Sequence, residues 1–335
     1  MKGVCKYLTL ATAIMALLFA GNQILRRRQT VLQAGQFHTS TAYVQTIPET
    51  TPPPTEEPPS PEELACEKAG KKILAGHVFV YDVTDREMLY CNTDSTDKLY
   101  PASITKLFSA WVGLQILDPD TVITAGKELG LLQPGSSTAY IAYGSSLTAR
   151  MLVEAMMLPS GNDAAYVLAA AAGRKLKEDD TLSAKKAVAA FVEEMNRRAQ
   201  EVGLANSHFE NPDGYHGENH YSCPGDLATI GELALGNEII SEFIKLQQDS
   251  VRFASGETIT WYNTNRLLNP ESAWYSEHAI GMKTGYTQEA GYCLLAAFQQ
   301  EEQQILVGIF DADNKLSRYT DAITLFEAIK EPAED

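Results

Sequence analysis

The chain has 335 residues, 44% of them hydrophobic, and its formal net charge at pH 7 is -16. This length accommodates one large folded domain or two small ones, together with a tail. The charge excludes a nucleic-acid-binding protein, because phosphate recognition needs clustered Lys and Arg, and the body of this chain has no such cluster.

The N-terminus has the layout of a secretory signal or a signal anchor, since residues 7–25 form an apolar run that follows two lysines. Leu18-Phe19-Ala20 is a poor cleavage site. Three arginines, at residues 26–28, directly follow the apolar run. They fit neither a secretory signal nor a signal anchor well, because positive charge prefers the cytoplasmic side. We predict an uncleaved membrane anchor over residues 1–28, with the bulk of the chain outside the cytoplasm. Cleavage would instead release a secreted protein.

Residues 39–61 are rich in Pro, Thr and Glu and nearly free of large apolar side chains. Such a segment cannot bury enough surface to offset the entropy of ordering its backbone. We therefore predict an extended, disordered linker over residues 29–61, which would hold a domain away from the membrane. A single folded domain is expected over residues 62–335.

The folded domain is expected to open with a β-hairpin, because residues 73–83 alternate and are β-branched, and residues 88–91 return after a turn. After an apolar helix from Pro101, helical patterns and caps predict helices over residues 148–157, 163–173, 181–202 and 222–235. The last third contains three predicted strands and a closing helix, at residues 278–284, 291–298, 304–310 and 316–329. This order is typical of an α+β fold in which the terminal strands form one antiparallel sheet covered by helices.

The helix that begins near Pro101 carries Ser103 and Lys106 three residues apart, so their side chains share one face. Apolar residues behind them recur at helical spacing, which predicts a buried helix whose first turn faces a cleft. Burial disfavours the ammonium form of Lys106, so its amine is suited to take the serine proton and activate a nucleophile. The spacing alone is a weak signal, because it recurs in surface segments at Ser95–Lys98 and Ser183–Lys186.

Two further motifs each occur once: Ser160-Gly161-Asn162 between two predicted helices, and Lys283-Thr284-Gly285 at the end of a predicted strand. Taken separately, each has a plain structural explanation, such as a helix cap at Ser160 or a turn at Asn162. In order after Ser103-x-x-Lys106, they form the set found in class A β-lactamases and penicillin-binding proteins. Three motifs in order, each on the element that it needs, predict an active site.

From about Leu74 onward the sequence resembles the low-molecular-weight penicillin-binding proteins, the serine-type D-alanyl-D-alanine carboxypeptidases. Besides the three motifs, the resemblance rests on residues 158–165, 202–214, 220–222, 226–228 and 263–268. It implies the penicillin-recognising fold, with a sheet flanked by helices, a helical lobe and a cleft between them. It also implies that peptidoglycan stem peptides ending in D-Ala-D-Ala are the substrate and that β-lactams are covalent inhibitors. No cofactor or metal is expected.

The expected roles follow from chemistry and agree with that family. Ser103 would attack the carbonyl between the two D-alanines and form an acyl-enzyme that water later hydrolyses. Lys106 would act as the base, with its pKa lowered by burial and by the second cation, Lys283. Ser160 would relay a proton from Lys106 to the leaving amine, and the Asn162 amide would contact the substrate's peptide group.

The substrate-binding residues are expected along the last motif. Lys283 and Thr284 suit the terminal carboxylate, and Gly285 lets the substrate backbone lie against the strand edge. The backbone N–H groups of Ser103 and Tyr286 would form the oxyanion hole. Arg318, expected in the loop before the closing helix, resembles a further carboxylate contact of the family.

Three alternatives stay open. A β-lactamase would need Glu-x-x-Leu-Asn, and Glu201–Ala205 comes close but has Ala in place of the final Asn. A D,D-endopeptidase acting on cross-linked peptides shares all three motifs. A sensor that binds penicillin or muropeptides without turnover would need a defective site, which the intact motifs argue against.

The cysteines and histidines predict no metal site. The spacing in His216-Gly217-Glu218-Asn219-His220 places the Glu one position late for a zinc helix, in a glycine-rich loop. Cys66 and Cys91 could form a disulfide in an oxidising compartment, but buried free thiols are the default expectation.

Overall fold

The computed structural model describes residues 59–330. The predicted signal anchor over 1–28 and nearly all of the predicted linker lie outside these residues. Within the described range, every helix is too short or too polar to cross a membrane. Helix α2 begins at Pro61, the last residue of the predicted linker.

Five antiparallel strands form the central sheet, in the order β2-β1-β9-β8-β7. In that order their bounds are Glu87–Cys91, His77–Asp82, Gln303–Ala312, Gly291–Gln300 and Ala279–Thr287. Successive side chains of a strand point to opposite faces. In β8, Leu294 and Phe298 belong to one hydrophobic cluster, whereas Leu295 and Ala297 belong to another. The sheet is therefore covered on both faces, and β7 forms one of its outer edges.

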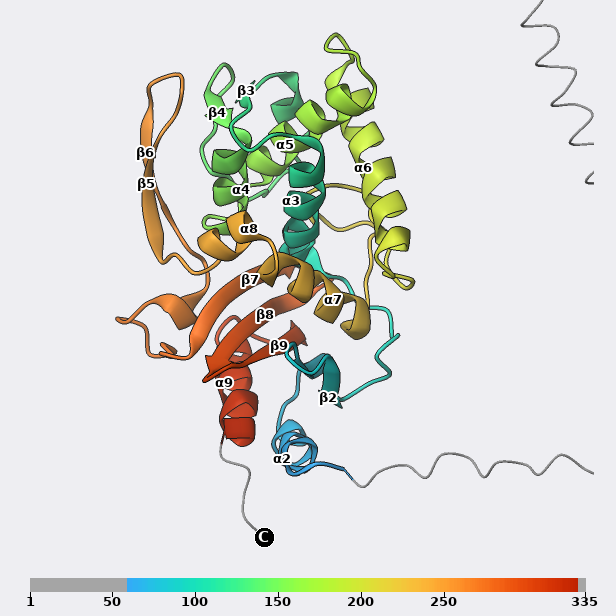
Figure 1. Cartoon of the computed structure of the whole chain (residues 1–335), viewed down its shortest axis with the longest axis vertical. Helices are drawn as coiled ribbons and strands as arrows, with labels where there is room; N and C mark the ends of the chain where they lie inside the picture. Colours follow the sequence, from blue (N-terminus) through green and yellow to red (C-terminus); the bar gives the residue numbers. More distant parts are fainter. Residues whose placement is uncertain (1–58, 331–335) are drawn as a thin grey trace, which may run out of the picture. The chain divides into compact units, whose positions relative to one another are not determined.

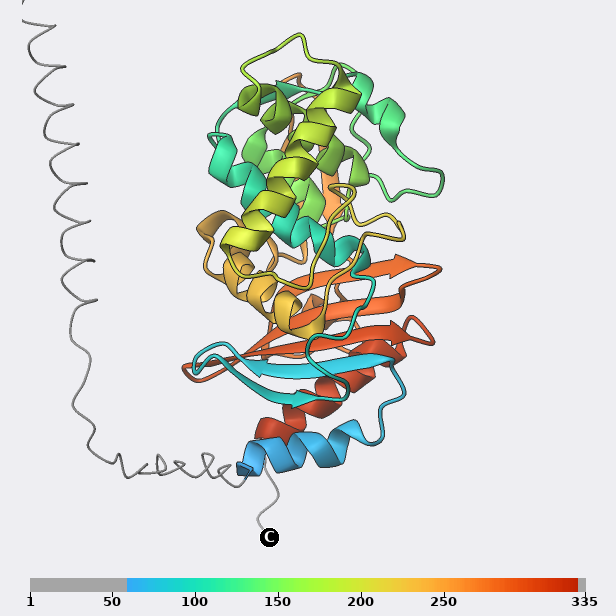
Figure 2. The same cartoon turned by 90° about the vertical axis from the view of Figure 1, so that its right-hand side faces the viewer.

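Helices α2 (Pro61–Gly70) and α9 (Ser317–Lys330) cover one face of the sheet (Figure 2). The rings of Phe298 on β8 and Phe326 on α9 stack with centroids 4.4 Å apart. Burying an aromatic side chain of this size stabilises the fold by about 1.5–3 kcal/mol. This layer holds α9 against β8, the neighbour of the strand β7 that carries the third motif.

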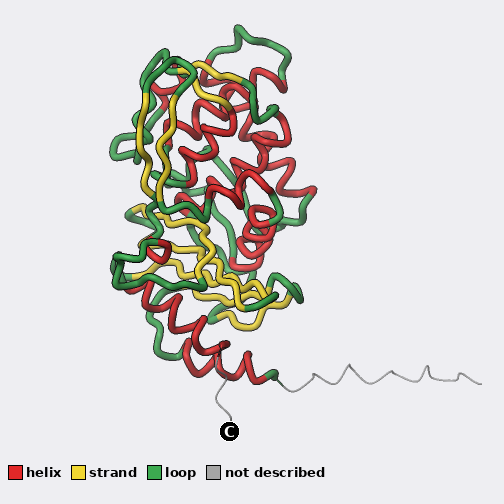
Figure 3. The backbone as a smooth tube through the Cα atoms, turned by 60° about the vertical axis from the view of Figure 1, so that its left-hand side comes forward, coloured by secondary structure: helices red, strands yellow, loops and turns green. Residues whose placement is uncertain are grey.

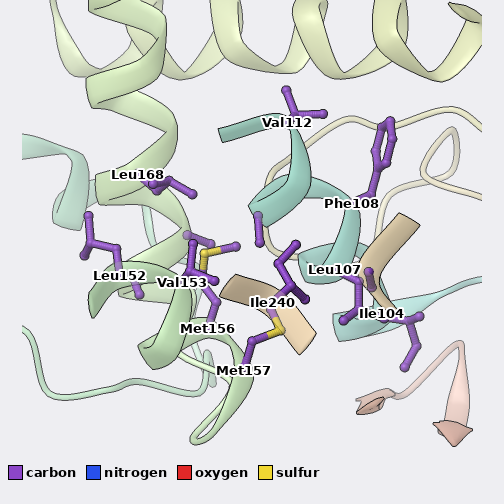
Figure 4. Packing of buried hydrophobic residues seen from close by; sticks show 14 of the residues in the cluster. Ile104, Leu107, Phe108, Val112, Leu152, Val153, Met156, Met157, Leu168 and Ile240 are labelled. Carbon is purple, nitrogen blue, oxygen red and sulfur yellow. The ribbon is translucent and has the colours of Figure 1, made fainter. Parts of the chain in front are cut away.

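The other face carries a helical lobe with α3 at its centre (Figure 1). Its helices are α3 Thr105–Ile116, α4 Ala149–Met157, α5 Asn162–Leu176, α6 Ala184–Glu201, α7 Pro224–Leu235 and α8 Glu238–Phe243. Side chains of α3 pack against those of α4, α5 and α8, as Leu107, Met156 and Ile240 illustrate in Figure 4. The first turn of α3 is thereby fixed at the border between lobe and sheet.

Two small antiparallel ribbons complete the lobe: β3 (Val122–Thr124) with β4 (Ser146–Thr148), and β5 (Gln248–Arg252) with β6 (Thr258–Tyr262). The second ribbon stands at the side of the lobe (Figure 3). Trp261 anchors it, because its indole packs against Phe253 and its Nε1 donates to the Ala139 carbonyl at 3.0 Å.

The predicted α+β architecture is confirmed, with the terminal strands in one antiparallel sheet. Thr148 caps α4 as expected, since its hydroxyl accepts from the Met151 N–H. The predicted cap at Ser222 is wrong: Cys223 precedes α7, and the Ser222 hydroxyl is hydrogen-bonded to that of Ser207. Helices α2 and α8 and the β5–β6 ribbon were not predicted.

Candidate active site

Ser103 and Lys106 lie where the chain enters the helical lobe. The short 3-10 turn η1 (Ala102–Ile104) runs directly into α3, so Ser103 precedes the α-helix proper. Ala102 has a φ of 48°, a left-handed conformation that costs a non-glycine residue free energy and is typical of functional sites. The Lys106 Nζ donates hydrogen bonds to Ser103 Oγ and to the backbone oxygen of Asp213, both at 2.7 Å. Nucleophile and candidate base are thus in direct contact.

Burial tunes the amine of Lys106. The side chain is inaccessible to solvent, and burial lowers its pKa to about 8. The carboxyl groups of Asp213 and Asp163 act in the opposite direction and raise this pKa. Lys283 was expected to lower the pKa of Lys106. The structure instead shows the charge of Lys106 lowering the pKa of Lys283.

Ser160 and Asn162 lie in the tight connection between α4 and α5. Ser160 has a φ of 63° and is buried, and its carbonyl accepts a hydrogen bond from the Ser137 hydroxyl at 2.6 Å. The same hydroxyl lies 3.2 Å from Asn162 Oδ1. The Asp163 carboxylate accepts hydrogen bonds from the backbone N–H of Ala139 at 2.8 Å and from that of Ile141 at 3.0 Å. These bonds connect the loop of Ser137 to the motif.

Strand β7 places Lys283, Thr284 and Gly285 beside the nucleophile. A Cβ at Gly285 would lie 2.9 Å from the Ala102 Cβ and 3.0 Å from the Ser103 nitrogen, so only glycine allows this approach. The Thr284 hydroxyl is hydrogen-bonded to the Thr264 hydroxyl at 2.6 Å.

Lys283 is buried, and its Nζ donates to the Thr284 carbonyl at 3.1 Å. Burial, followed by the charges of Lys106 and Arg318, lowers its pKa well below the usual value. Tyr286, the next residue along β7 after the motif, is 56% exposed.

Arg318 was expected in the loop before the closing helix. It lies instead in the first turn of α9. Its Nη1 donates to the carbonyl oxygens of Gly285 at 3.0 Å and Cys293 at 2.9 Å. Its Nε is buried without a hydrogen-bond partner in the described part of the chain. The guanidinium therefore braces β7 and β8, while the residue also lines the cavity.

One cavity of about 920 Å³ joins these groups. Seven of the nine predicted site residues line it: Ser103, Ser160, Asn162, Thr284, Gly285, Tyr286 and Arg318. Lys106 and Lys283 are absent from this lining, although Lys106 touches Ser103 directly. Ser137, Asp213 and Thr264 also line the cavity. No site role was predicted for them: Ser137 lies outside every motif, and Asp213 and Thr264 lie in stretches that carry the resemblance but not in the three motifs.

His220 supports α3 from behind. Its Nδ1 accepts from the Glu210 N–H at 3.1 Å, so Nε2 carries the proton and donates to the Thr105 hydroxyl at 2.8 Å. Burial lowers the pKa of His220 to about 3, which keeps it neutral. Residues 59–330 contain no group of His, Cys, Asp or Glu side chains arranged to hold a metal ion. Cys66 is a buried free thiol, as expected by default, whereas Cys91 is a free thiol that is only half-buried.

Comparison with known proteins gives one consistent match. A family model described as D-alanyl-D-alanine carboxypeptidase matches residues 64–314. The D-alanyl-D-alanine carboxypeptidase of Streptomyces sp. (strain K15) is 32% identical over 229 residues, which cover 66% of this chain and 75% of that protein. D-alanyl-D-alanine carboxypeptidase DacF of Bacillus subtilis is 29% identical over 235 residues, but these span only 56% of its length and 69% of this chain.

A D-alanyl-D-alanine endopeptidase of Haemophilus influenzae is 28% identical over 253 residues, which cover 75% of this chain and 80% of that protein. Among solved structures, the Streptomyces K15 DD-transpeptidase superposes with a TM-score of 0.69 at 28% sequence identity. That alignment covers 77% of this chain and 97% of the transpeptidase.

Proposed function

Because the chain belongs to the D-alanyl-D-alanine carboxypeptidase family, we propose that it removes the terminal D-alanine from peptidoglycan stem peptides through an acyl-enzyme on Ser103. The observation that carries this proposal is the 2.7 Å contact between Lys106 Nζ and Ser103 Oγ. Family membership supplies the reaction class, and this contact supplies the nucleophile and base in the geometry that acyl transfer needs.

In the acylation step, Ser103 Oγ bonds to the carbonyl carbon of the penultimate D-alanine while Lys106 takes the hydroxyl proton. The peptide C–N bond then breaks, and the proton passes through the Ser160 hydroxyl to the leaving amine. Water later attacks the ester carbonyl while Lys106 accepts its proton; the bond to Ser103 Oγ then breaks, and the proton returns from Lys106 to the serine. An amine with a pKa of about 8 exchanges protons readily near neutral pH, which supports its double role.

The substrate would bind as an added strand on the outer edge of β7, which has no neighbouring strand in the described sheet. Its terminal carboxylate would lie near Lys283 and Thr284, where the buried amine is hydrogen-bonded to a backbone carbonyl and has no ion-pair partner within residues 59–330. The N–H groups of Ser103 and Tyr286 would stabilise the oxyanion, and losing one such donor costs about 10²–10³ in kcat in comparable enzymes. Arg318 contributes positive charge from behind the strand.

Peptidoglycan lies outside the cytoplasmic membrane, so the protein acts in an extracytoplasmic compartment. Residues 1–28 would anchor it there, and residues 29–61 would separate the catalytic domain from the membrane. The same serine would be acylated by β-lactams, whose strained amide and carboxylate imitate the D-alanyl-D-alanine end.

A second candidate is D,D-endopeptidase activity on cross-linked peptides. The observation in its favour is the match to the Haemophilus influenzae endopeptidase, which covers 75% of this chain. Both reactions use one acyl-enzyme and differ in the size of the amine that leaves.

The test is release of free D-alanine from diacetyl-L-Lys-D-Ala-D-Ala by the full chain in detergent, beside a Ser103→Ala control. Release that disappears in the control and is blocked by penicillin supports the carboxypeptidase. Cleavage of a cross-linked dimer without release of D-alanine favours the endopeptidase. A stable penicillin adduct without turnover of either peptide would contradict both and leave the sensor.

A further inference from the structure

The cavity contains a carboxylate that has no part in the proposed mechanism. Glu289 lies in the turn between β7 and β8, where its side chain is 44% exposed and lines the cavity. Facing it is His216, whose Nδ1 lies 4.0 Å from Glu289 Oε2, which is beyond hydrogen-bonding distance. The His216 Nδ1 is buried and has no hydrogen-bond partner in the described structure. His216 Nδ1 and Glu289 Oε2 therefore face each other without forming a hydrogen bond.

The position of His216 is fixed by packing. Its ring stands edge-on to the ring of Tyr100, with centroids 4.8 Å apart. Glu289 and His216 thus form two facing walls, one on the sheet and one on the loop that follows Asp213.

Glu289 carries an uncompensated charge. Within residues 59–330, no Lys or Arg nitrogen lies within 4.0 Å of its carboxylate, and His216 is its one ion-pair contact. Asp213, the other acidic residue of the cavity lining, is buried beneath the nucleophile. Among the described lining residues, Glu289 is therefore the accessible acidic group, and it favours a cationic ligand.

The direction of a bound peptide follows from the order of groups along β7. The reacting carbonyl must lie beside Ser103 and Gly285, and the terminal carboxylate must lie toward Lys283. The part of the peptide N-terminal to the reacting bond then extends past Tyr286 toward the end of the strand. Each extended residue advances about 3.4 Å, so the residue before D-alanyl-D-alanine lies beside Tyr286 or Thr287, and only a long side chain on it extends toward the turn that carries Glu289.

We propose that Glu289 forms a subsite for a free side-chain amine on the residue that precedes D-alanyl-D-alanine. This inference rests on the proposed action on D-alanyl-D-alanine peptides. The amine donates to the Glu289 carboxylate, with His216 as the opposite wall of the subsite. A stem whose side-chain amine is still free gains this charged hydrogen bond, whereas a stem acylated at that amine loses it. The enzyme thereby distinguishes unlinked stems from stems already joined through this amine.

The experiment compares two peptides that differ only in the amine: acetyl-L-Lys-D-Ala-D-Ala and acetyl-L-norleucyl-D-Ala-D-Ala. Their dissociation constants are measured by calorimetry on the full chain carrying Ser103→Ala, which binds without turnover. The lysyl peptide is expected to bind about tenfold more tightly, as one charged hydrogen bond of about 1.4 kcal/mol gives. The added substitution Glu289→Gln should reduce this ratio to about one.

Glu277→Gln is the matched control, because Glu277 also lies 4.0 Å from a histidine, His278, but does not line the cavity. It should leave the ratio at about ten. An unchanged preference in the Glu289→Gln variant, or equal binding of the two peptides before that substitution, overturns the subsite. Failure of the proposed function is read separately, as absence of D-alanine release from both peptides by the unsubstituted enzyme.

Discussion

The two motifs that carry buried lysines differ in what surrounds the amine. Lys106, at the start of α3, has two oxygen acceptors at 2.7 Å and two carboxyl groups that raise its pKa against the effect of burial. Lys283, on β7, has one acceptor at 3.1 Å in the described structure and faces two cations. The first amine is placed to exchange a proton with a hydroxyl. The charged form of the second would be stabilised by the substrate carboxylate that we propose it binds.

The largest effect is expected from Lys106→Met, which removes the base and leaves the apolar volume. The rate of acylation by penicillin and by D-alanyl-D-alanine peptides should fall by about 10³–10⁴, because Ser103 then lacks a proton acceptor. Stopped-flow measurement of acylation checks this. Lys186→Met is the control, since Lys186 belongs to an equivalent Ser-x-x-Lys spacing on the exposed side of α6, and should leave the rate unchanged. A Lys106→Met enzyme that acylates at the normal rate would exclude this lysine as the base.

Gly285→Ala tests the close approach of β7 to the nucleophile. The new Cβ would lie 2.9–3.0 Å from the Ala102 Cβ and the Ser103 nitrogen, so the strand must shift away from Ser103. We expect kcat/KM for D-alanine release to fall by about 10², since small displacements of reacting groups have effects of this size.

Gly130→Ala is the control for steric effects of a methyl group, because a Cβ there would meet nothing within 4 Å. Normal activity in Gly285→Ala with an unchanged melting temperature would show that the substrate does not use this edge of β7.

Lys283→Met sharpens the contrast between the two lysines, because it should act on binding rather than on chemistry. Losing a charged hydrogen bond to the terminal carboxylate should raise KM about 10–100-fold. The decisive comparison is a peptide amide without the carboxylate, whose KM should be nearly insensitive to Lys283→Met. Equal losses for both peptides would place Lys283 in the chemistry instead.

The smallest effect concerns pH. Because the neutral amine of Lys106 is the active form, acylation should increase as pH rises through about 8. Asp213 raises the pKa of Lys106, so Asp213→Asn should lower that pKa and move the rise in acylation rate to lower pH. The profile of kcat/KM between pH 5 and 10 measures the shift. A rise that stays at the same pH would show that Asp213 is protonated in the free enzyme and exerts no charge on Lys106.

The sequence predicted which residues lie together better than it predicted the fold around them. Ser103, Ser160 and Gly285 belong to three ordered motifs, and the structure brings all three to one cavity. Asp213 and Thr264 lie in stretches that carry the family resemblance, but no role was predicted for them, since their positions depend on loops that only tertiary packing brings to the site. The contacts of Arg318 with two backbone carbonyls could not be predicted from the sequence either, because α9 lies beside β7 only in the folded protein.

The secondary structure shows the same limit. Strands β7, β8 and β9 were predicted near their observed bounds, and β8 and β9 each contain a continuous apolar run. Strand β5 (Gln248–Arg252) is mostly exposed and polar, so it lacks that signal and depends on Trp261 of β6 for its place. Helix α2 did have a signal, the capping box of Ser60 and Glu63, but its position beside the Pro-rich segment obscured it.

The most direct test of the central claim is to locate the acyl group. The full chain is incubated with benzylpenicillin, digested, and sequenced by tandem mass spectrometry, beside Ser103→Ala and Ser160→Ala variants. A single adduct on Ser103, absent from Ser103→Ala and formed more slowly in Ser160→Ala, is the result that this structure predicts. An adduct on Ser160 or on any other side chain, or a normal adduct yield in Ser103→Ala, would contradict it.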